Sequence, residues 1–425
     1  MSERVKGILL FVLVLVALRF FEIRFAGDLI GIKIPIVILT LISIYSLKSF
    51  FKYQGGFSLP IRLMTFATFF SIIISLLVWG QSIPQSFRST AIILIYPVFF
   101  LLKDYNFKTR LIEQVILLLG FIYVVLYFFQ FQFPQKAFFG YALGATEGDY
   151  SDEGRGIIRI IFPGAGVFWL AVFISICKIT SKVKTAYYHI VFAILGIVIP
   201  ILQVIRQLVA FIVVLYTFHF GVQLSLAKKL LFIAAFFGVS IYVISLDLPF
   251  INSLEETTRR DTELGSDYIR VVAGKYFLFD FSDNILSQIF GNGFPNYNSN
   301  YGKAMSKLTG QGYFLEDIGI IGLYTQAGVF AVLAWLIIFY KSFTIPIPKE
   351  YMYCKYYIWM ILVTSLTSGS IFNIHFTISS VLVLYIYHIE SQNIGKDKLK
   401  KLLVYLQKKN ISLEEIKKES PATSI

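Results

Sequence analysis

Long blocks of apolar residues, separated by short polar stretches, fill most of this 425-residue sequence. A transmembrane helix needs roughly 17 to 25 mostly apolar residues, because the bilayer core contains no water to satisfy backbone N–H and C=O groups. The strands of a membrane barrel would alternate apolar and polar residues, whereas these blocks are continuous. The sequence therefore predicts an all-α polytopic membrane protein.

The number of blocks predicts about twelve transmembrane helices. The stretch 187–221 is longer than a bilayer is thick and carries Pro200, Gln203 and Arg206 near its centre. We therefore expect two helices there, with Arg206 at their junction. The twelve blocks lie at 7–21, 29–47, 62–79, 89–102, 111–131, 161–177, 187–204, 207–222, 229–246, 316–340, 356–372 and 374–389.

Lys and Arg residues predict the orientation, because their transfer across the membrane is disfavoured during insertion. With both termini in the cytoplasm, 24 of the 38 Lys and Arg residues are cytoplasmic. This topology accounts for the net charge of +13 without a nucleic-acid partner. It gives a transmembrane domain at 1–390, with long external loops at about 132–160 and 247–314. A basic tail follows at 391–425, expected to lie on the inner leaflet as an amphipathic helix.

Arginine and lysine are distributed differently across this topology. Of the 12 arginines, 9 fall on or near the outer side, whereas 21 of the 26 lysines are cytoplasmic. A planar guanidinium binds phosphate or carboxylate through two hydrogen bonds and is more weakly hydrated than an ammonium group. The outward excess of arginine predicts recognition of an anion near the membrane surface, with anchoring to lipid headgroups as the alternative.

Arg206 is the most informative of these arginines. It stands amid apolar sequence at the start of a predicted helix, and ionisable groups at such depths are functional candidates. A helix N-terminus also offers unpaired N–H groups and a partial positive charge to an anion. The alternative is that Arg206 extends to the interface.

Further candidates lie in or beside the external loops. Glu147 and Asp149 are candidates for a general base or for partners of the loop arginines, although an acidic run is most often a solvated loop. His375 is expected on the outer side as a proton-transfer group or as a structural residue. The residues predicted to bind a diphosphate or sugar are Arg88, Arg155, Arg159, Arg206, Arg259, Arg260, Arg270, Tyr297 and Tyr313. No His, Cys, Asp or Glu cluster has metal-ligand spacing, so we expect neither a metal nor a cofactor.

The arrangement resembles the O-antigen polymerase and ligase superfamily of bacterial envelope glycosyltransferases (the Wzy and WaaL types). The similarity covers nearly the whole chain. It rests on an outward arginine at a mid-chain helix junction (Arg206), on a long external loop with an early arginine (Arg270), and on the segments Gly291–Phe294 and Leu315–Gly322 around the start of the next helix. Where ligases usually carry a histidine before that helix, this sequence has Gly310–Tyr313, which favours a polymerase.

The resemblance implies a multi-pass protein of the bacterial inner membrane that polymerises undecaprenyl-diphosphate-linked oligosaccharides on the periplasmic side. Arg206 and Arg270 would hold the diphosphate, and partner proteins would regulate chain length or flip the lipid-linked unit. Three alternatives stay open: a ligase that transfers the glycan to lipid A-core, a transporter or flippase without chemistry, and a structural or sensing membrane protein. A transporter usually shows two related halves, and no internal repeat is visible here.

Overall fold

The computed structural model describes most of the chain. Outside the description lie Met1, Asp28, Ile92, 141–150, 153–156, Arg159, 182–185, Val204, 224–258, 260–262, 264, 266–267 and 409–425, together with the side chains of Ala26, 151–152, 157–158, 222–223 and 396–408. The described residues form helices, apart from loops and a pair of two-residue strands, β1 (Ser151–Asp152) and β2 (Ile157–Ile158), which pair antiparallel. The all-α prediction is confirmed at this level.

Several helices are long and apolar enough to cross a membrane. Within the described residues these are the segment Leu29–Ser49, α3 (Ser58–Trp79), α6 (Thr109–Gln132) and α15 (Ile320–Thr344). The segment Leu29–Ser49 contains α2 (Ile34–Ser46). Three shorter apolar helices are α7 (Ala165–Thr180), α8 (Tyr187–Leu202) and α9, which begins at Arg206 and ends at Gln223. The chain is a membrane protein; the expected helix at 229–246 lies outside the described residues.

Small residues allow the long helices to pack closely. α15 packs along α3, α6 along α7, and α7 along α8. Ala327, Ala331 and Ala334 of α15 are fully buried, and a Cβ atom at Gly120 of α6 would lie 2.8 Å from the Cβ of Ala171 in α7. Helices in a membrane associate through such close packing, because lipid provides no hydrophobic drive between them.

One predicted helix is bent. The block 89–102 was expected to be a single span, but the structure divides it between α4 (Ile83–Thr90) and the segment Ile93–Asp104, which meet at an angle of 72°. That segment contains α5 (Val98–Asp104), preceded by a 3-10 turn and by Pro97. Proline has no N–H to donate and clashes with the preceding helical turn, which agrees with the 3-10 turn Ile93–Ile95 before α5.

Two other predicted helices end early. α1 (Glu3–Ala17) was expected to reach residue 21, and α16 (Tyr353–Thr364) was expected to reach residue 372. Beyond Thr364 the sequence is rich in Ser, Thr and Gly, and the Ser368 hydroxyl donates to the Thr364 carbonyl. Such side chains compete for helical backbone hydrogen bonds, and the chain leaves the helix. The predicted break between α8 and α9 is confirmed.

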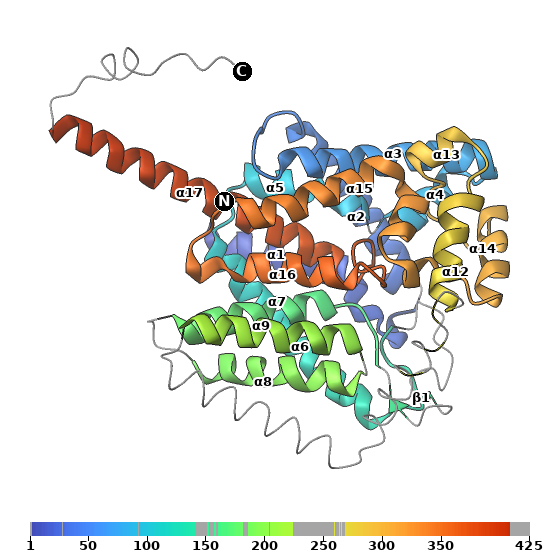
Figure 1. Cartoon of the computed structure of the whole chain (residues 1–425), viewed down its shortest axis with the longest axis horizontal. Helices are drawn as coiled ribbons and strands as arrows, with labels where there is room; N and C mark the ends of the chain where they lie inside the picture. The colour runs from blue at the N-terminus through green and yellow to red at the C-terminus, as the bar shows by residue number, and fades with distance from the viewer. Residues whose placement is uncertain are drawn as a thin grey trace.

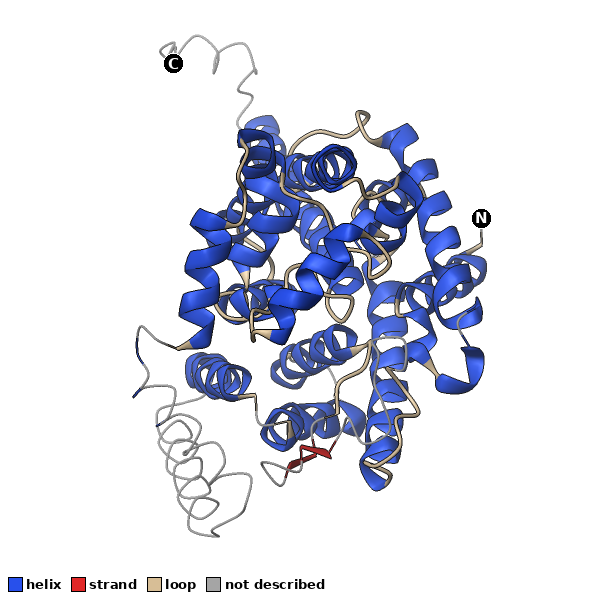
Figure 2. Cartoon of the chain, turned by 90° about the vertical axis from the view of Figure 1, so that its right-hand side faces the viewer, coloured by secondary structure: helices blue, strands red, loops and turns tan. Residues whose placement is uncertain are grey.

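Different helices lie at the two ends of the molecule. α12 (Ile269–Lys275), α13 (Ile285–Phe290) and α14 (Asn300–Gly310) gather at one end, while the N-terminus and α17 (Thr377–Lys408) lie at the other (Figure 1). We call these the α12–α14 end and the N-terminal end. Figure 2 looks onto the α12–α14 end, with the strand pair at its lower edge. The described part of the segment 247–314, which was expected to be an external loop, is thus largely helical.

Lysine–carboxylate contacts cluster at helix termini expected to be cytoplasmic. The Glu113 carboxylate lies 2.9 Å from Lys178 and accepts a hydrogen bond of 2.8 Å from the Tyr353 hydroxyl. These groups join the second turn of α6 to the last turn of α7 and the first turn of α16. They agree with the expectation that these three termini share one side of the membrane.

The tail is continuous with the last helix. The boundary expected at residues 390 and 391 falls inside α17, which extends without a break to Lys408. The amphipathic arrangement expected for the tail depends on side chains beyond residue 395, which lie outside the described part of the chain.

Glycines fix the connection between α13 and α14. Gly291 and Gly293 have φ angles of +78° and +82°. The amides of Asn292 and Gly293 donate to the carbonyls of Thr325 and Gln326 in α15, at 2.8 and 2.9 Å. A Cβ atom at Gly291 would lie 2.4 Å from the Gln326 oxygen. The glycines therefore let the backbone dock directly on α15, and this position fixes the segment that follows.

Candidate functional site

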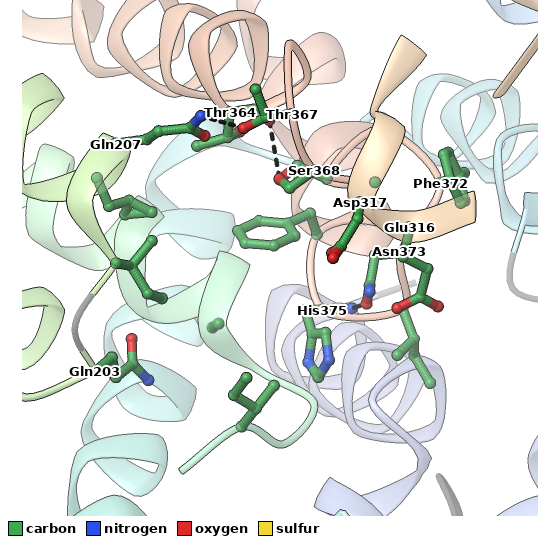
Figure 3. Close-up of a pocket in the computed structure, with 18 of the residues that line it drawn as sticks. Gln203, Gln207, Glu316, Asp317, Thr364, Thr367, Ser368, Phe372, Asn373 and His375 are labelled. Atoms are coloured by element: carbon green, nitrogen blue, oxygen red, sulfur yellow. Dashed lines mark hydrogen bonds between the residues drawn. The ribbon is translucent and has the colours of Figure 1, made fainter. Parts of the chain in front are cut away.

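A cavity of about 1220 Å³ opens beside α9, α12 and the loop between α16 and α17. Figure 3 shows Gln203 and Gln207 on one side of it and Glu316, Asp317 and Asn373 on the other. Its charged and polar walls include Arg19, Gln203, Arg206, Gln207, Arg270, Glu316, Asp317, Thr367, Ser368, Asn373 and His375.

The cavity collects helix ends that the charge bias places on the outer side. Its walls come from the C-terminal side of α1, the N-terminal side of α7, the junction between α8 and α9, the residues before α15, and the α16–α17 loop. These segments are far apart in sequence, yet the predicted topology puts all of them on one face. The cavity is therefore at the side where the arginine excess was predicted.

Arg206 and Arg270 line the same cavity. Arg206 is the first residue of α9, at an N-terminus where backbone N–H groups and the helix dipole favour an anion. Beside it, the Gln207 amide donates to the Thr367 hydroxyl, and the Gln203 amide donates to the Ile160 carbonyl at 3.0 Å. These hydrogen bonds connect the α8–α9 junction to the α16–α17 loop and to the residues before α7.

Arg270 forms an ion pair across the cavity wall. Its Nη2 atom lies 3.3 Å from Oδ2 of Asp317, and both side chains are partly exposed. Arg270 belongs to α12 and Asp317 to the 3-10 turn Leu315–Ile318 before α15. A partly exposed pair of this kind is worth little in stability, but it restricts the orientation of the guanidinium.

Glu316 also lines the cavity, next to Asp317. Its side chain is exposed at the cavity surface. Partial desolvation of the carboxylate in the cavity and the negative charge of Asp317 raise the pKa of Glu316 above its usual value. A carboxylate with a raised pKa accepts a proton more readily than an ordinary one.

Arg19 reaches the cavity from a left-handed turn. Four consecutive residues, Arg19 to Glu22, have φ angles between +48° and +60°, namely 49°, 54°, 58° and 51°. Each residue in this region costs about 1–2 kcal/mol. Arg19 Nη1 lies 3.2 Å from the buried carboxylate of Glu22. The strained turn thus places a third, internally paired arginine at the cavity.

His375 is buried in the cavity wall. Its Nδ1 lies 2.9 Å from the Phe162 carbonyl oxygen. Because a carbonyl only accepts, Nδ1 carries the hydrogen and donates. Burial lowers the pKa of His375 to about 4, although the hydrogen bond to Phe162 acts in the opposite direction. The ring is therefore neutral at pH 7, with its lone pair on Nε2.

The remaining predicted residues have different positions. Tyr297 lines the cavity, whereas Arg88 lines a smaller groove between α2 and α4. Arg259 is 75% exposed, interacts with Glu263 at 3.8 Å and is absent from the cavity wall. Tyr313 packs against Tyr276 in an apolar cluster outside the cavity. Five predicted residues lie outside the described part of the chain: Glu147, Asp149, Arg155, Arg159 and Arg260.

Three charged cavity residues were not predicted from the sequence as site residues: Arg19, Glu316 and Asp317. Arg19 was counted among the outer arginines, and its position at the end of an apolar block was the available signal. Glu316 and Asp317 are two consecutive carboxylates at the start of a predicted transmembrane helix, where charge is disfavoured. That cost was a signal for a functional role.

Comparison with known proteins gives no relative: no protein-family model, no curated protein and no solved structure matches this chain. Among the described residues, no group of three or more His, Cys, Asp or Glu side chains is placed to hold a metal ion. The site is therefore interpreted from its own residues.

Proposed function

We propose that this protein polymerises undecaprenyl-diphosphate-linked oligosaccharides into a surface polysaccharide such as O-antigen, on the periplasmic side of the bacterial inner membrane. The observation that carries the proposal is a single cavity lined by Arg19, Arg206 and Arg270 together with Glu316 and Asp317. The arginines suit a diphosphate, and the carboxylates suit a sugar hydroxyl.

The arginines would act on the leaving group. When the glycosidic bond from the anomeric carbon to the diphosphate oxygen breaks, negative charge develops on the diphosphate. Guanidinium groups already in place stabilise that charge without reorganisation. Arg206 and Arg270 are the residues for this role, because one lies at a helix N-terminus and the other is oriented by Asp317.

Glu316 would act on the acceptor. A hydroxyl of the second lipid-linked glycan attacks the anomeric carbon, forms the new C–O bond and transfers its proton to the Glu316 carboxylate. The raised pKa of Glu316 suits this role. Asp317 is a positioning residue, since its carboxylate is engaged with Arg270. The products are an elongated lipid-linked glycan and a free lipid diphosphate.

The cavity is large enough to hold more than a diphosphate headgroup. At about 1220 Å³ it exceeds the range of roughly 300–1,000 Å³ for ordinary small-ligand pockets. Phe294, Tyr297 and Phe372 in its wall offer aromatic faces to the C–H faces of sugars. The cavity thus has room for a diphosphate and the sugar units on both sides of the bond that is formed.

The test is reconstitution of the purified full-length chain in liposomes with a purified lipid-linked repeat unit. A polymerase yields a ladder of longer lipid-linked glycans and releases one lipid diphosphate for each unit added. In liposomes that also contain lipid A-core, transfer of the unit to lipid A-core without a ladder would make the protein a ligase. Movement of the unit across the bilayer without elongation would make it a flippase, and either outcome would overturn the proposal.

A further inference from the structure

A second, smaller hollow lies between α2 and α4. It has a volume of about 350 Å³. Its α2 wall is one helix face, with spacings of three, four, seven and eight residues from Lys33 to Leu41, and its α4 wall is likewise one face. The lining residues are Lys33, Ile36, Val37, Thr40, Leu41, Pro84, Phe87 and Arg88. We call this hollow the α2–α4 groove.

The α2–α4 groove combines a lipid-like interior with positive charge. Val37 and Leu41 are 57% and 61% exposed on a helix that is apolar enough to span a membrane. The hydroxyl of Thr40 donates to the Ile36 carbonyl at 2.8 Å, so it does not require a polar ligand. Among the described residues no carboxylate forms an ion pair with Lys33 or Arg88. The groove therefore suits an apolar chain with an anionic headgroup.

The α2–α4 groove adjoins the large cavity. Arg88 lines the groove, and the next residue of α4, Ser89, lines the cavity. Arg19, also in the cavity wall, is close enough to experience the positive charge of Arg88. An anion held by Arg88 would relieve this repulsion, and a glycan attached to it would be directed at the cavity.

We propose that the α2–α4 groove binds a second molecule of polyprenyl-diphosphate-linked glycan, the acceptor, with the diphosphate at Lys33 and Arg88 and the first part of the isoprenoid chain along α2. This inference rests on the proposed function, since polymerisation joins two lipid-linked glycans. A single groove fits one isoprenoid chain, whereas a phospholipid carries two acyl chains. The donor diphosphate occupies Arg206 and Arg270, so each substrate has its own pair of cations.

The experiment is photolabelling of the purified full-length chain in phosphatidylcholine nanodiscs with a polyprenyl diphosphate that carries a diazirine in its chain. The labelled residues are then mapped by mass spectrometry. The wild type is expected to be labelled on α2 and α4. Lys33→Gln combined with Arg88→Gln is expected to lower this labelling at least tenfold. The matched control is Lys303→Gln with Lys307→Gln, two exposed lysines of α14 away from both hollows, and it is expected to leave the labelling unchanged.

Two results would overturn the proposal. One is unchanged labelling of α2 and α4 in the Lys33→Gln/Arg88→Gln protein. The other is displacement of the probe by phosphatidylglycerol as effectively as by unlabelled polyprenyl diphosphate, which would make the groove a general anionic-lipid site. Val37→Trp provides a second variant that fills the groove without changing charge, with Leu118→Trp on the exposed face of α6 as its control.

The groove and the catalytic proposal can fail separately. Labelling of α2 and α4 is expected to persist in Arg206→Gln/Arg270→Gln, because that protein retains Lys33 and Arg88. If the wild type is labelled in the groove but makes no polymer, the proposed function fails. A different result would exclude the acceptor role of the groove. In that case both the wild type and Lys33→Gln/Arg88→Gln make polymer, and the two proteins have the same half-saturating substrate concentration.

Discussion

The guanidinium of Arg270 lies 3.3 Å from the carboxylate of Asp317, and the two residues are 47 positions apart on separate elements that meet at the cavity. This pair defines how the site is prepared before substrate binds. Asp317 holds one edge of the guanidinium, and the arginine side chain keeps further N–H donors for a diphosphate.

The pair predicts non-additive effects on catalysis. Arg270→Gln should lower the elongation rate about 100- to 1000-fold, the range found when one fixed donor to a developing anion is removed. Asp317→Asn should cost about tenfold or less, because the arginine remains but is less well oriented. The double variant should match Arg270→Gln alone. Initial rates with purified lipid-linked repeat units provide the measurement. Strictly multiplicative losses would mean that the two side chains act independently.

The raised pKa of Glu316 predicts the acidic limb of the pH profile. As the pH falls through this pKa the carboxylate is protonated, and elongation should decline tenfold per pH unit, starting above the ordinary glutamate value of 4.5. Glu316→Gln should lower the rate about 100-fold or more and remove this limb. The measurement is the elongation rate between pH 4.5 and 8. A Gln variant that keeps the same acidic limb would exclude Glu316 as the base.

His375 predicts a pH-dependent stability. Its pKa is lowered in the folded protein, so the unfolded chain binds the proton more readily and stability falls as the pH drops from 6.5 towards 4. The shift corresponds to about 3 kcal/mol at its full extent. His375→Asn keeps an N–H for the Phe162 carbonyl and should flatten this dependence. Thermal unfolding in detergent at several pH values is the measurement, and an unchanged slope would contradict the assignment.

The glycine connection after α13 predicts a large effect from one methyl group. A Cβ atom at Gly293 would lie 2.6 Å from the Cβ of Ser75 and 2.8 Å from the Ser71 oxygen, at a φ of +82°. Gly293→Ala should destabilise the protein by on the order of 3 kcal/mol. Gly310→Ala is the matched control, because nothing lies within 4 Å of its Cβ position. Equal melting temperatures for the two variants would argue against the docked backbone.

The sequence predicted those features that depend on local composition. Apolar length predicted the long helices, and the polar centre of the stretch 187–221 predicted the break before Arg206. Arg206 and Arg270 were paired as diphosphate ligands through the family resemblance, and the structure places both in one cavity.

The features that were missed depend on tertiary context. The left-handed turn at Arg19–Glu22 has no local sequence signal, because its residues are not those that favour positive φ. The apolar block at 356–372 was read as a helix throughout, since periodicity does not show that its second half turns back as a cavity wall. Tyr313 was predicted to bind sugar but packs on Tyr276, because aromatic residues in loops serve packing as readily as recognition.

The most direct test of the diphosphate site compares three proteins in the same liposome assay: the wild type, Arg206→Gln/Arg270→Gln, and Arg259→Gln. Arg259 is an exposed arginine that precedes Arg270 in the segment 247–314 and lies outside the cavity wall. If the cavity arginines hold the departing diphosphate, the double variant should lose at least 1000-fold in elongation rate while remaining folded, and Arg259→Gln should elongate at the wild-type rate. Normal polymer from the double variant, at a rate within tenfold of wild type, would contradict the account.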